Sequence, residues 1–412
     1  MVIIMRILIV SQYFWPENFS VNTIAKYLTS KGHKVDVLTG LPNYPQGKVY
    51  EGYTGKENRH QKYEECTIDR VWIKERGQKG GDKRLILNYL SYVVNASCNI
   101  MTRLGKKYDA TFVYEVSPIT QAIPALLLRK LKKVPMCLYV ADLWPDTLFS
   151  HGMNSGTVKK ILTRVCSHIY RRTDNIVIVN ESFRKPIEKY TDNKRTIIYI
   201  PQSADPVYKP LEPSDVLRKQ LGLCADDLII MFAGNLGFAQ SVKTVVEAAN
   251  KVSHQKDIHF VFVGDGTLRA ECEEYCKANN LNNCHFIGKK KPDEMPGLIA
   301  EADAMLVTLK NQSNYNLTLP GRTQSFMACA KPIICCANGE TARVVKAAKC
   351  GLVSEAENSD KLAESIVKFS TLNATERNAL AESGLQYSRD NYDQQTMLQN
   401  IEKVLAGMRY AK

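Results

Sequence analysis

Several signatures of familiar protein classes are absent from the 412 residues. No Cys-x-x-Cys pair and no His/Cys set at metal-ligand spacing occurs, which argues against a zinc domain. No Asp-x-Asp motif is present to hold a divalent ion, so we expect no bound metal. A P-loop and a serine-hydrolase elbow are also missing. No apolar run is long enough to span a membrane, and the N-terminal segment does not have the pattern of a signal peptide.

The 12 cysteines are scattered along the chain, which is typical of reduced thiols in a cytosolic protein. Apolar residues make up 44% and charged residues 24%, values close to those of globular proteins. The length suggests two or three domains. Disordered chains and small disulfide-linked scaffolds are therefore excluded.

Positive charge is concentrated in the first half of the chain. Residues 1–200 contain 31 Lys and Arg against 17 Asp and Glu, whereas residues 201–412 contain 24 against 25. This asymmetry favours an anionic partner, which is nucleic acid, a lipid surface or a phosphorylated substrate. A basic surface that only confers solubility is the alternative.

Short Val- and Ile-rich runs alternate with helical patterns, which predicts an α/β fold with parallel sheets. Predicted strands in the first half are 6–11, 34–39, 110–114, 136–141, 176–179 and 196–200. The pattern then restarts with predicted strands at 228–233, 259–263, 284–287, 304–308 and 332–336. Two Rossmann-like units in series are therefore expected.

We place the joint near 201–205 and predict three segments. Residues 1–203 are expected to form an N-terminal Rossmann-like domain, and residues 204–386 a C-terminal one. Residues 387–412 are expected to form a C-terminal helix. In open α/β sheets ligands bind beyond the carboxyl ends of the strands, so function is sought in the loops there.

Two such loops carry acidic residues. Asp142 follows the strand at 136–141 within Asp-Leu-Trp-Pro, where it suits orienting a sugar hydroxyl or offsetting positive charge on a sugar carbon. Glu340 follows the strand at 332–336 and is expected in the same crevice. A helix cap or a buried structural carboxylate is the alternative reading of Asp142.

The most specific loop is Leu319-Pro320-Gly321-Arg322, which opens a helix. Arg322 in the first turn is unfavourable for the helix dipole. Its position is explained if an anion binds at the helix N-terminus, where Arg322 and backbone amides share it. Gly234 lies in a Gly-Asn-Leu-Gly loop that lets a ligand approach the backbone closely, although a tight turn explains it equally.

These motifs, with Gln12-Tyr-Phe-Trp-Pro-Glu-Asn18 and Gly32-His-Lys-Val-Asp, resemble the family-four retaining glycosyltransferases of the GT-B fold. The resemblance covers nearly the whole chain and is strongest to the WbuB-type N-acetyl-L-fucosamine transferases of O-antigen and capsule assembly. It implies a UDP-sugar donor, transfer with retention, a lipid-diphosphate-linked saccharide as acceptor, and no resident cofactor.

The resemblance also implies that residues 1–203 form the domain on the acceptor and membrane side, that residues 204–386 bind the nucleotide-sugar donor, and that the helix at 387–412 returns to the first domain. Asp142, Arg322 and Glu340 would be catalytic, and Phe286, Ile287, Gly288 and Lys289 would flank the base. The remaining donor contacts would come from Asn18, Phe19, Gly234, Asn235, Lys243, Thr318, Leu319, Pro320, Gly321 and Ser325. The chain departs from the family where Leu317 and Ser325 replace a glutamate pair. It also departs where Asn235 and Gln240 replace an Arg/Lys pair, so Lys243 and Arg322 are the cationic candidates.

Basic residues in the 70–84 segment (Lys74, Arg76, Lys79, Lys83 and Arg84) precede an apolar, amphipathic stretch that starts at Leu85. A second basic cluster follows at 129–133. Both predict peripheral binding to the anionic inner face of a cell membrane. The alternatives are a non-hydrolysing UDP-N-acetylamino-sugar 2-epimerase and a catalytically silent membrane scaffold. A nucleic-acid-binding protein is disfavoured because no recognisable binding module is present.

Overall fold

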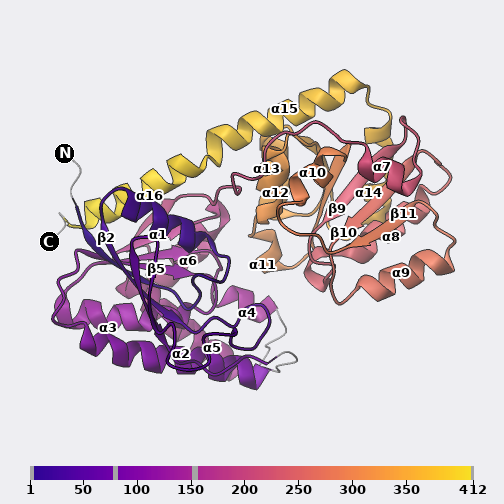
Figure 1. The fold of residues 1–412 in the computed structure, drawn as a ribbon. Helices are drawn as coiled ribbons and strands as arrows, with labels where there is room; N and C mark the ends of the chain where they lie inside the picture. The colour runs from indigo at the N-terminus through magenta and orange to yellow at the C-terminus, as the bar shows by residue number, and fades with distance from the viewer. Residues whose placement is uncertain (1–3, 78–81, 151–155, 410–412) are drawn as a thin grey trace. The chain divides into compact units, whose positions relative to one another are not determined.

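The computed structural model describes residues 4–77, 82–150 and 156–409, and these fold into two compact units (Figure 1). Unit 1 comprises the chain up to Ile200 together with the segment from Leu398 onward, and unit 2 comprises Pro201–Met397. Residues 201–203 and 387–397 thus belong to unit 2. Each unit has its own parallel sheet with helices on both faces, and the predicted α/β fold class is confirmed.

Unit 1 is built on an eight-stranded sheet in the order β3-β4-β2-β1-β5-β6-β7-β8. All neighbours are parallel except β3, which is antiparallel to β4. The strands are β1 (Arg6–Val10), β2 (Lys34–Gly40), β3 (His60–Tyr63), β4 (Cys66–Val71), β5 (Ala110–Glu115), β6 (Met136–Val140), β7 (Asn175–Ile178) and β8 (Thr196–Tyr199). The β3–β4 hairpin is absent from the sequence prediction because β3 is polar and largely exposed.

The helices of unit 1 are α1 (Ser20–Ser30), α2 (Asp82–Thr102), α3 (Ile123–Lys132), α4 (Asp146–Ser150), α5 (Gly156–Arg172) and α6 (Arg184–Thr191). Helix α16 (Gln394–Arg409) begins in unit 2 and belongs to unit 1 from Leu398 onward. Helices α2, α3 and α5 lie side by side on one face of the sheet (Figure 1). Glu402 of α16 accepts a hydrogen bond from the Tyr27 hydroxyl (2.8 Å) and contacts His33 Nε2 (3.1 Å). These contacts attach the end of the chain to the first unit.

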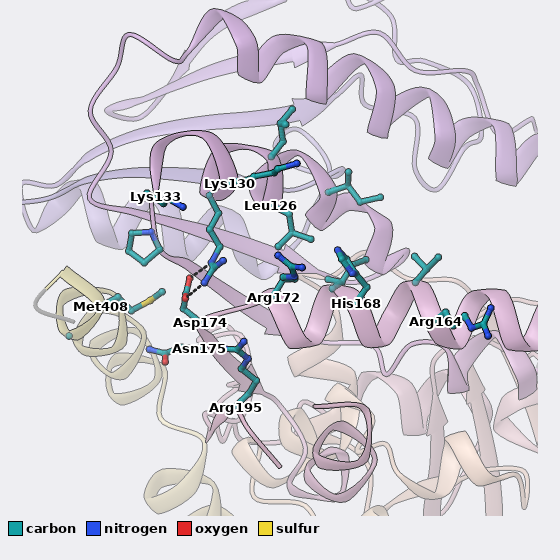
Figure 2. Close-up of a pocket in the computed structure, with 17 residues that line it drawn as sticks. Leu126, Lys130, Lys133, Arg164, His168, Arg172, Asp174, Asn175, Arg195 and Met408 are labelled. Atoms are coloured by element: carbon teal, nitrogen blue, oxygen red, sulfur yellow. Dashed lines mark hydrogen bonds and ion pairs between the residues drawn. The ribbon is translucent and has the colours of Figure 1, made fainter. Parts of the chain in front are cut away.

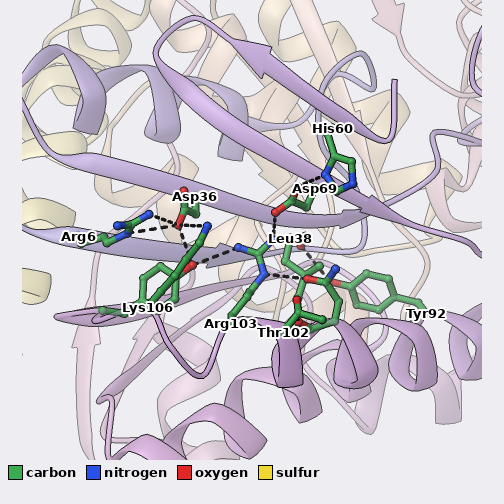
Figure 3. A network of polar contacts seen from close by, with 11 residues as sticks. Arg6, Asp36, Leu38, His60, Asp69, Tyr92, Thr102, Arg103 and Lys106 are labelled. Carbon is green, nitrogen blue, oxygen red and sulfur yellow. Dashed lines mark hydrogen bonds and ion pairs between the residues drawn. The ribbon is translucent and has the colours of Figure 1, made fainter. Parts of the chain in front are cut away.

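A buried polar network joins β1, β2 and the segment after α2 (Figure 3). Asp36 accepts hydrogen bonds from Tyr108 Oη (2.7 Å) and Arg6 Nη2 (3.0 Å), and Lys106 Nζ is 3.3 Å away. Arg103 donates to Tyr108 Oη (3.1 Å). Partial burial alone would raise the pKa of Asp36, but the hydrogen bonds from Tyr108 and Arg6 outweigh it and lower that pKa. The network therefore keeps the Asp36 carboxylate ionised, although Asp36 is buried on β2.

Unit 2 is built on a six-stranded parallel sheet in the order β11-β10-β9-β12-β13-β14. The strands are β9 (Leu228–Ala233), β10 (Ile258–Val263), β11 (Cys284–Gly288), β12 (Ala304–Thr308), β13 (Ile333–Cys336) and β14 (Gly351–Ser354). Side chains alternate between two cores, as the two-residue period of a strand requires. Ile230 and Phe232 pack into one core, and Ile229 and Met231 into the other.

Helices α8 (Val242–Lys251), α9 (Arg269–Ala278) and α14 (Ser359–Ser370) cover the first core of unit 2. The second core is covered by α10 (Met295–Ala300), α12 (Gly321–Ala328) and α13 (Gly339–Ala347). The shorter helices are α7 (Val216–Leu221) and α11 (Ser313–Asn316). The returning helix predicted at 387–412 is instead divided between two elements, because α15 (Ala374–Asn391) ends at Asn391 and α16 begins at Gln394.

Candidate active site

A pocket of about 620 Å³ lies in unit 2 beyond the carboxyl ends of β9, β10 and β11. Its floor is formed by the loops after these strands, and α12 supplies one wall. Of the residues predicted to bind donor, the pocket is lined by Gly234, Asn235, Lys289, Arg322 and Ser325. This position is where an open α/β sheet binds its ligand.

Two glycines bring the loops after β9 and β10 into backbone contact. Gly264 has φ +144°, and a Cβ atom there would lie 1.8 Å from the carbonyl oxygen of Gly234. Gly234 also has φ +144°, and its Cβ position is 3.0 Å from Arg322 Nη1. Because L side chains rarely adopt such φ values, only glycine fits both positions without strain. Backbone is therefore exposed to the pocket beside the guanidinium of Arg322.

Arg322 stands at the start of α12, and its guanidinium points back over the sheet. Nη2 donates to the carbonyl of Thr308 (3.0 Å), and the guanidinium carbon lies 5.0 Å from the centre of the Phe232 ring. Within the described ranges no carboxylate forms an ion pair with this side chain, and Nε has no hydrogen-bond partner. Burial lowers the pKa of Arg322 to about 10, so the group remains a cation at neutral pH. A partly buried cation without a counterion attracts an anion.

The rest of the predicted anion loop has mainly structural contacts. Pro320 is the N-cap of α12, and Gly321 is its first residue. The Thr318 hydroxyl donates to Asn314 O (3.0 Å), and Leu319 is buried in a core. Ser325, which lines the pocket, donates its hydroxyl to Gly321 O (3.3 Å). The pocket is therefore not lined by the four residues that precede Arg322 in the chain: Thr318, Leu319, Pro320 and Gly321.

Two predicted residues of unit 2 lie away from this pocket. Glu340, in the first turn of α13, is buried and forms a two-bond ion pair with Arg343 (2.7 and 2.9 Å). Lys243, in the first turn of α8, is ion-paired with Glu271 of α9. The structure therefore does not bring Glu340 and Lys243 together with Arg322 in one pocket.

The predicted base-flanking residues lie on and after β11. Phe286 stacks on Phe262 with ring centres 4.5 Å apart, so its ring is part of the sheet packing. Ile287 and Gly288 complete the strand, and Lys289 follows it at the pocket rim. Lys290, which the sequence prediction omits, also lines the pocket.

Unit 1 presents an aromatic cluster in the loop after β1. Asn18 is exposed, and Phe19 stacks on Tyr13 with ring centres 5.1 Å apart. Tyr44, from the loop after β2, packs against both rings. The guanidinium of Arg76 lies 5.6 Å from the Tyr13 ring centre and 5.4 Å from that of Tyr44. The cluster combines apolar ring faces with a cation at the carboxyl end of the sheet.

Asp142 is the second residue after β6, near the end of the adjacent strand β5. Burial raises the pKa of Asp142 to about 7. Glu115, the last residue of β5, is fully buried, and neither of its carboxylate oxygens has a hydrogen-bond partner. Burial first, and then the charge of Asp142, raise the pKa of Glu115 well above its ordinary value. Sequence reasoning missed Glu115, because only the pairing of β5 with β6 brings it close to Asp142.

Two absences apply to the parts of the chain that the structure describes. Among residues 4–77, 82–150 and 156–409 no group of three or more His, Cys, Asp or Glu side chains is arranged to hold a metal ion. In the same ranges no helix has the length and hydropathy needed to cross a membrane.

Comparison with known proteins agrees with this geometry. Residues 213–386 match the family model "Glycosyl transferases group 1". The chain is 27% identical over 336 residues to a putative colanic acid biosynthesis glycosyl transferase, WcaI, of Escherichia coli K12, covering 79% of this chain and 81% of that protein. It is 26% identical over 362 residues to N-acetyl-alpha-D-glucosaminyl L-malate synthase of Bacillus anthracis, covering 84% and 82%.

Solved structures show the same architecture at low identity. Sucrose-phosphate synthase from Thermosynechococcus elongatus superposes with a TM-score of 0.75 at 15% identity, covering 99% of this chain and all of that one. HepE from Anabaena, solved in complex with UDP, superposes with a TM-score of 0.72 at 16% identity, covering 98% and 100%.

The two parallel-sheet units and these neighbours define a GT-B protein, as predicted. The match to the group 1 glycosyl transferase model covers residues 213–386, which include Arg322 and most of the residues that line the pocket around it.

Proposed function

We propose that this protein transfers a sugar from a UDP-sugar to a lipid-linked saccharide during synthesis of a bacterial surface polysaccharide. The observation that supports it most directly is the guanidinium of Arg322, which lies beside the glycine loops of the unit 2 pocket and has no ion pair to a carboxylate among the described residues. The named activities of WcaI and the UDP complex of HepE agree with this assignment. N-acetyl-L-fucosamine or another N-acetylamino sugar is the proposed donor sugar.

The proposed reaction needs charge stabilisation at two places. Cleavage of the donor develops negative charge on the leaving diphosphate, which Arg322 and the backbone of the loops at Gly234 and Gly264 would receive. Positive charge develops on the sugar, and Asp142 is the unit 1 carboxylate proposed to offset it. The acceptor hydroxyl then loses its proton to the leaving phosphate on the same face, which retains the anomeric configuration and requires no protein base. In this scheme protein groups, rather than a metal ion, neutralise the diphosphate.

Attachment to a membrane surface forms part of the proposal, with the protein on the cytoplasmic face. Helix α2 exposes a line of large apolar side chains, each between 46 and 60% accessible: Ile86, Leu87, Leu90, Val94 and Met101. Exposed apolar patches of this kind mark contact surfaces. Lys83 and Arg84 begin the same helix, while Lys79 of the predicted basic segment lies outside the described residues.

The test is an Arg322→Ala substitution, with Arg389→Ala as the matched control because Arg389 is an exposed residue of unit 2 on α15. UDP affinity is measured by calorimetry, and turnover by mass spectrometry with a panel of UDP-sugars and extracted lipid acceptor. Loss of one such donor typically lowers kcat by about 100- to 1000-fold. We expect Arg322→Ala to weaken UDP binding and turnover while Arg389→Ala leaves both unchanged.

Three outcomes would contradict the proposal. Undiminished UDP binding by Arg322→Ala would remove the diphosphate role. A released, altered nucleotide sugar with no acceptor product would indicate the 2-epimerase instead. UDP-sugar binding with no turnover across the panel and acceptor extract would indicate a silent scaffold.

A further inference from the structure

A groove of about 1100 Å³ lies in unit 1 and is lined by none of the candidate site residues, but by Arg129, Lys130 and Lys133 of the predicted basic cluster among others (Figure 2). Helices α3, α5 and α16 form its walls, and the residues that precede or begin β6, β7 and β8 close one end. Those are the amino ends of the strands, whereas Glu115 and Asp142 stand at the carboxyl ends. A five-residue strand is about 17 Å long, so the groove is separate from the carboxyl-end loops.

The groove has a strong excess of positive charge. Six Lys and Arg side chains and one carboxylate, that of Asp174, line it. Asp174 is already paired with Arg129 through two hydrogen bonds of 2.7 and 2.6 Å. Although partial burial opposes it, the hydrogen bond from Arg129 lowers the pKa of Asp174, which keeps this pair ionised. Among the residues that the structure describes, no hydrogen bond or ion pair to a carboxylate is formed by the other five cations: Lys130, Lys133, Arg164, Arg172 and Arg195.

Helix-dipole stabilisation accounts for only part of this cluster. Lys130 and Arg172 lie in the last turns of α3 and α5, where cations are favourable. Arg164 is in the middle of α5, and Arg195 immediately precedes β8. Arg164 and Arg172 stand on one face of α5 with His168 between them (Figure 2). Like charges concentrated on one face repel each other, so an anion in the groove would relieve their repulsion.

The groove is also apolar. On α5 the side chains of Val165 and Ile169 line it beside the cationic face, and on α3 those of Leu126 and Leu127 do the same. Met408 of α16 adds to this lining. A free phosphate would satisfy the cations but leave the apolar wall exposed to water. An amphiphile with a phosphate headgroup matches both parts.

We propose that this groove binds the phosphate headgroup of an anionic phospholipid, with the lipid's first apolar carbons against α3 and α5. The inference deepens the proposed membrane attachment, because α2 contacts α3 and carries the exposed apolar line. It adds a specific lipid site at the amino edge of the unit 1 sheet, distinct from any site for the sugar donor.

The test uses dihexanoyl-phosphatidylglycerol below its micelle concentration, so that no membrane is required. Affinity is measured by calorimetry for the full chain, for the double variant Arg172→Glu/Arg195→Glu, and for the control Lys34→Glu/Lys56→Glu, which changes the same charge at exposed positions elsewhere in unit 1. Each surface cation contributes roughly fivefold to attraction by an anionic lipid. Loss of two cations should therefore weaken binding by about 30-fold or more, and the control should bind as the wild type does.

Three further arms decide the assignment. If inorganic phosphate displaces the lipid fully at equal concentration, the groove is a phosphate site. If hexaglutamate binds more tightly than the lipid, the groove is a protein-docking site. Either result overturns the proposal. Equal lipid binding by both double variants would also overturn it. Sedimentation with phosphatidylglycerol vesicles separates the two proposals. Suppose that Arg172→Glu/Arg195→Glu still binds vesicles and Leu90→Asp does not. That result would overturn the proposed lipid site in the groove and leave the proposed membrane attachment through α2 standing.

Discussion

Gly264→Ala tests whether the glycine loops are as tightly apposed as the structure shows. The added methyl group would lie 1.8 Å from Gly234 O, at a φ of +144° that alanine rarely adopts. Strained backbone of this kind costs about 1–3 kcal/mol, and overpacking costs about 1–3 kcal/mol more. The free energy of unfolding of unit 2 should therefore fall by about 2–6 kcal/mol, and UDP binding should weaken because the pocket floor is displaced.

The assay is urea unfolding followed by far-UV circular dichroism. Fluorescence is unsuitable, because the three tryptophans (Trp15, Trp72 and Trp144) all lie in unit 1. Gly297→Ala on α10 is the control, since the Cβ atom would meet no heavy atom within 4 Å other than those of its chain neighbours and its own helix backbone. Replacing a glycine inside a helix by alanine usually raises the free energy of unfolding by about 1 kcal/mol. The reasoning is refuted if the free energy of unfolding of Gly264→Ala lies within about 0.5 kcal/mol of the wild-type value, the usual range for neutral surface substitutions.

Two further predictions concern carboxylates of unit 1. Because burial raises the pKa of Asp142 to about 7, the folded chain binds more protons than the unfolded chain between pH about 4 and about 7, and stability falls as the pH rises through that window. Urea titrations should therefore show Asp142→Asn to be more stable than wild type at pH 8 but not at pH 4, and an equal difference at both values would contradict this. Asp36→Asn should lower the free energy of unfolding at pH 7 by about 1–3 kcal/mol, since it removes charged hydrogen bonds from Tyr108 and Arg6. Asp192→Asn is the control, because Asp192 pairs with Arg171 on the surface, where the Arg171 and Asp192 side chains are 51 and 54% accessible. It should change the free energy of unfolding by less than about 1 kcal/mol. Similar losses in Asp36→Asn and Asp192→Asn would argue against a stabilising role of the buried network.

The strands of both sheets are the part of the fold that sequence predicts best. Buried parallel strands such as β9 and β10 are continuous apolar runs, so hydrophobicity alone locates them. The β3–β4 hairpin is not predicted, because β3 contains His60, Gln61 and Lys62 and lies at the sheet edge. The break between α15 and α16 is also missed, since Tyr392 interrupts the helix without a glycine or proline to mark it.

The candidate site is predicted less completely. Arg322 is found because a cation in the first turn of a helix is locally unfavourable, and the structure places it in the pocket with Gly234. Glu340 shows what sequence position alone cannot predict. It follows a strand as expected, but its carboxylate forms an ion pair with Arg343, three residues further along the chain. Glu115 is missed because its significance depends on its burial next to Asp142, a contact between strands that sequence spacing does not reveal.

The most direct measurement is a crystal structure of the protein with UDP. The account predicts that both phosphorus atoms lie in the unit 2 pocket, within hydrogen-bonding reach of the Arg322 guanidinium and over the loops at Gly234 and Gly264. A diphosphate bound elsewhere on unit 2, with Arg322 still directed only at Thr308 O, would contradict it.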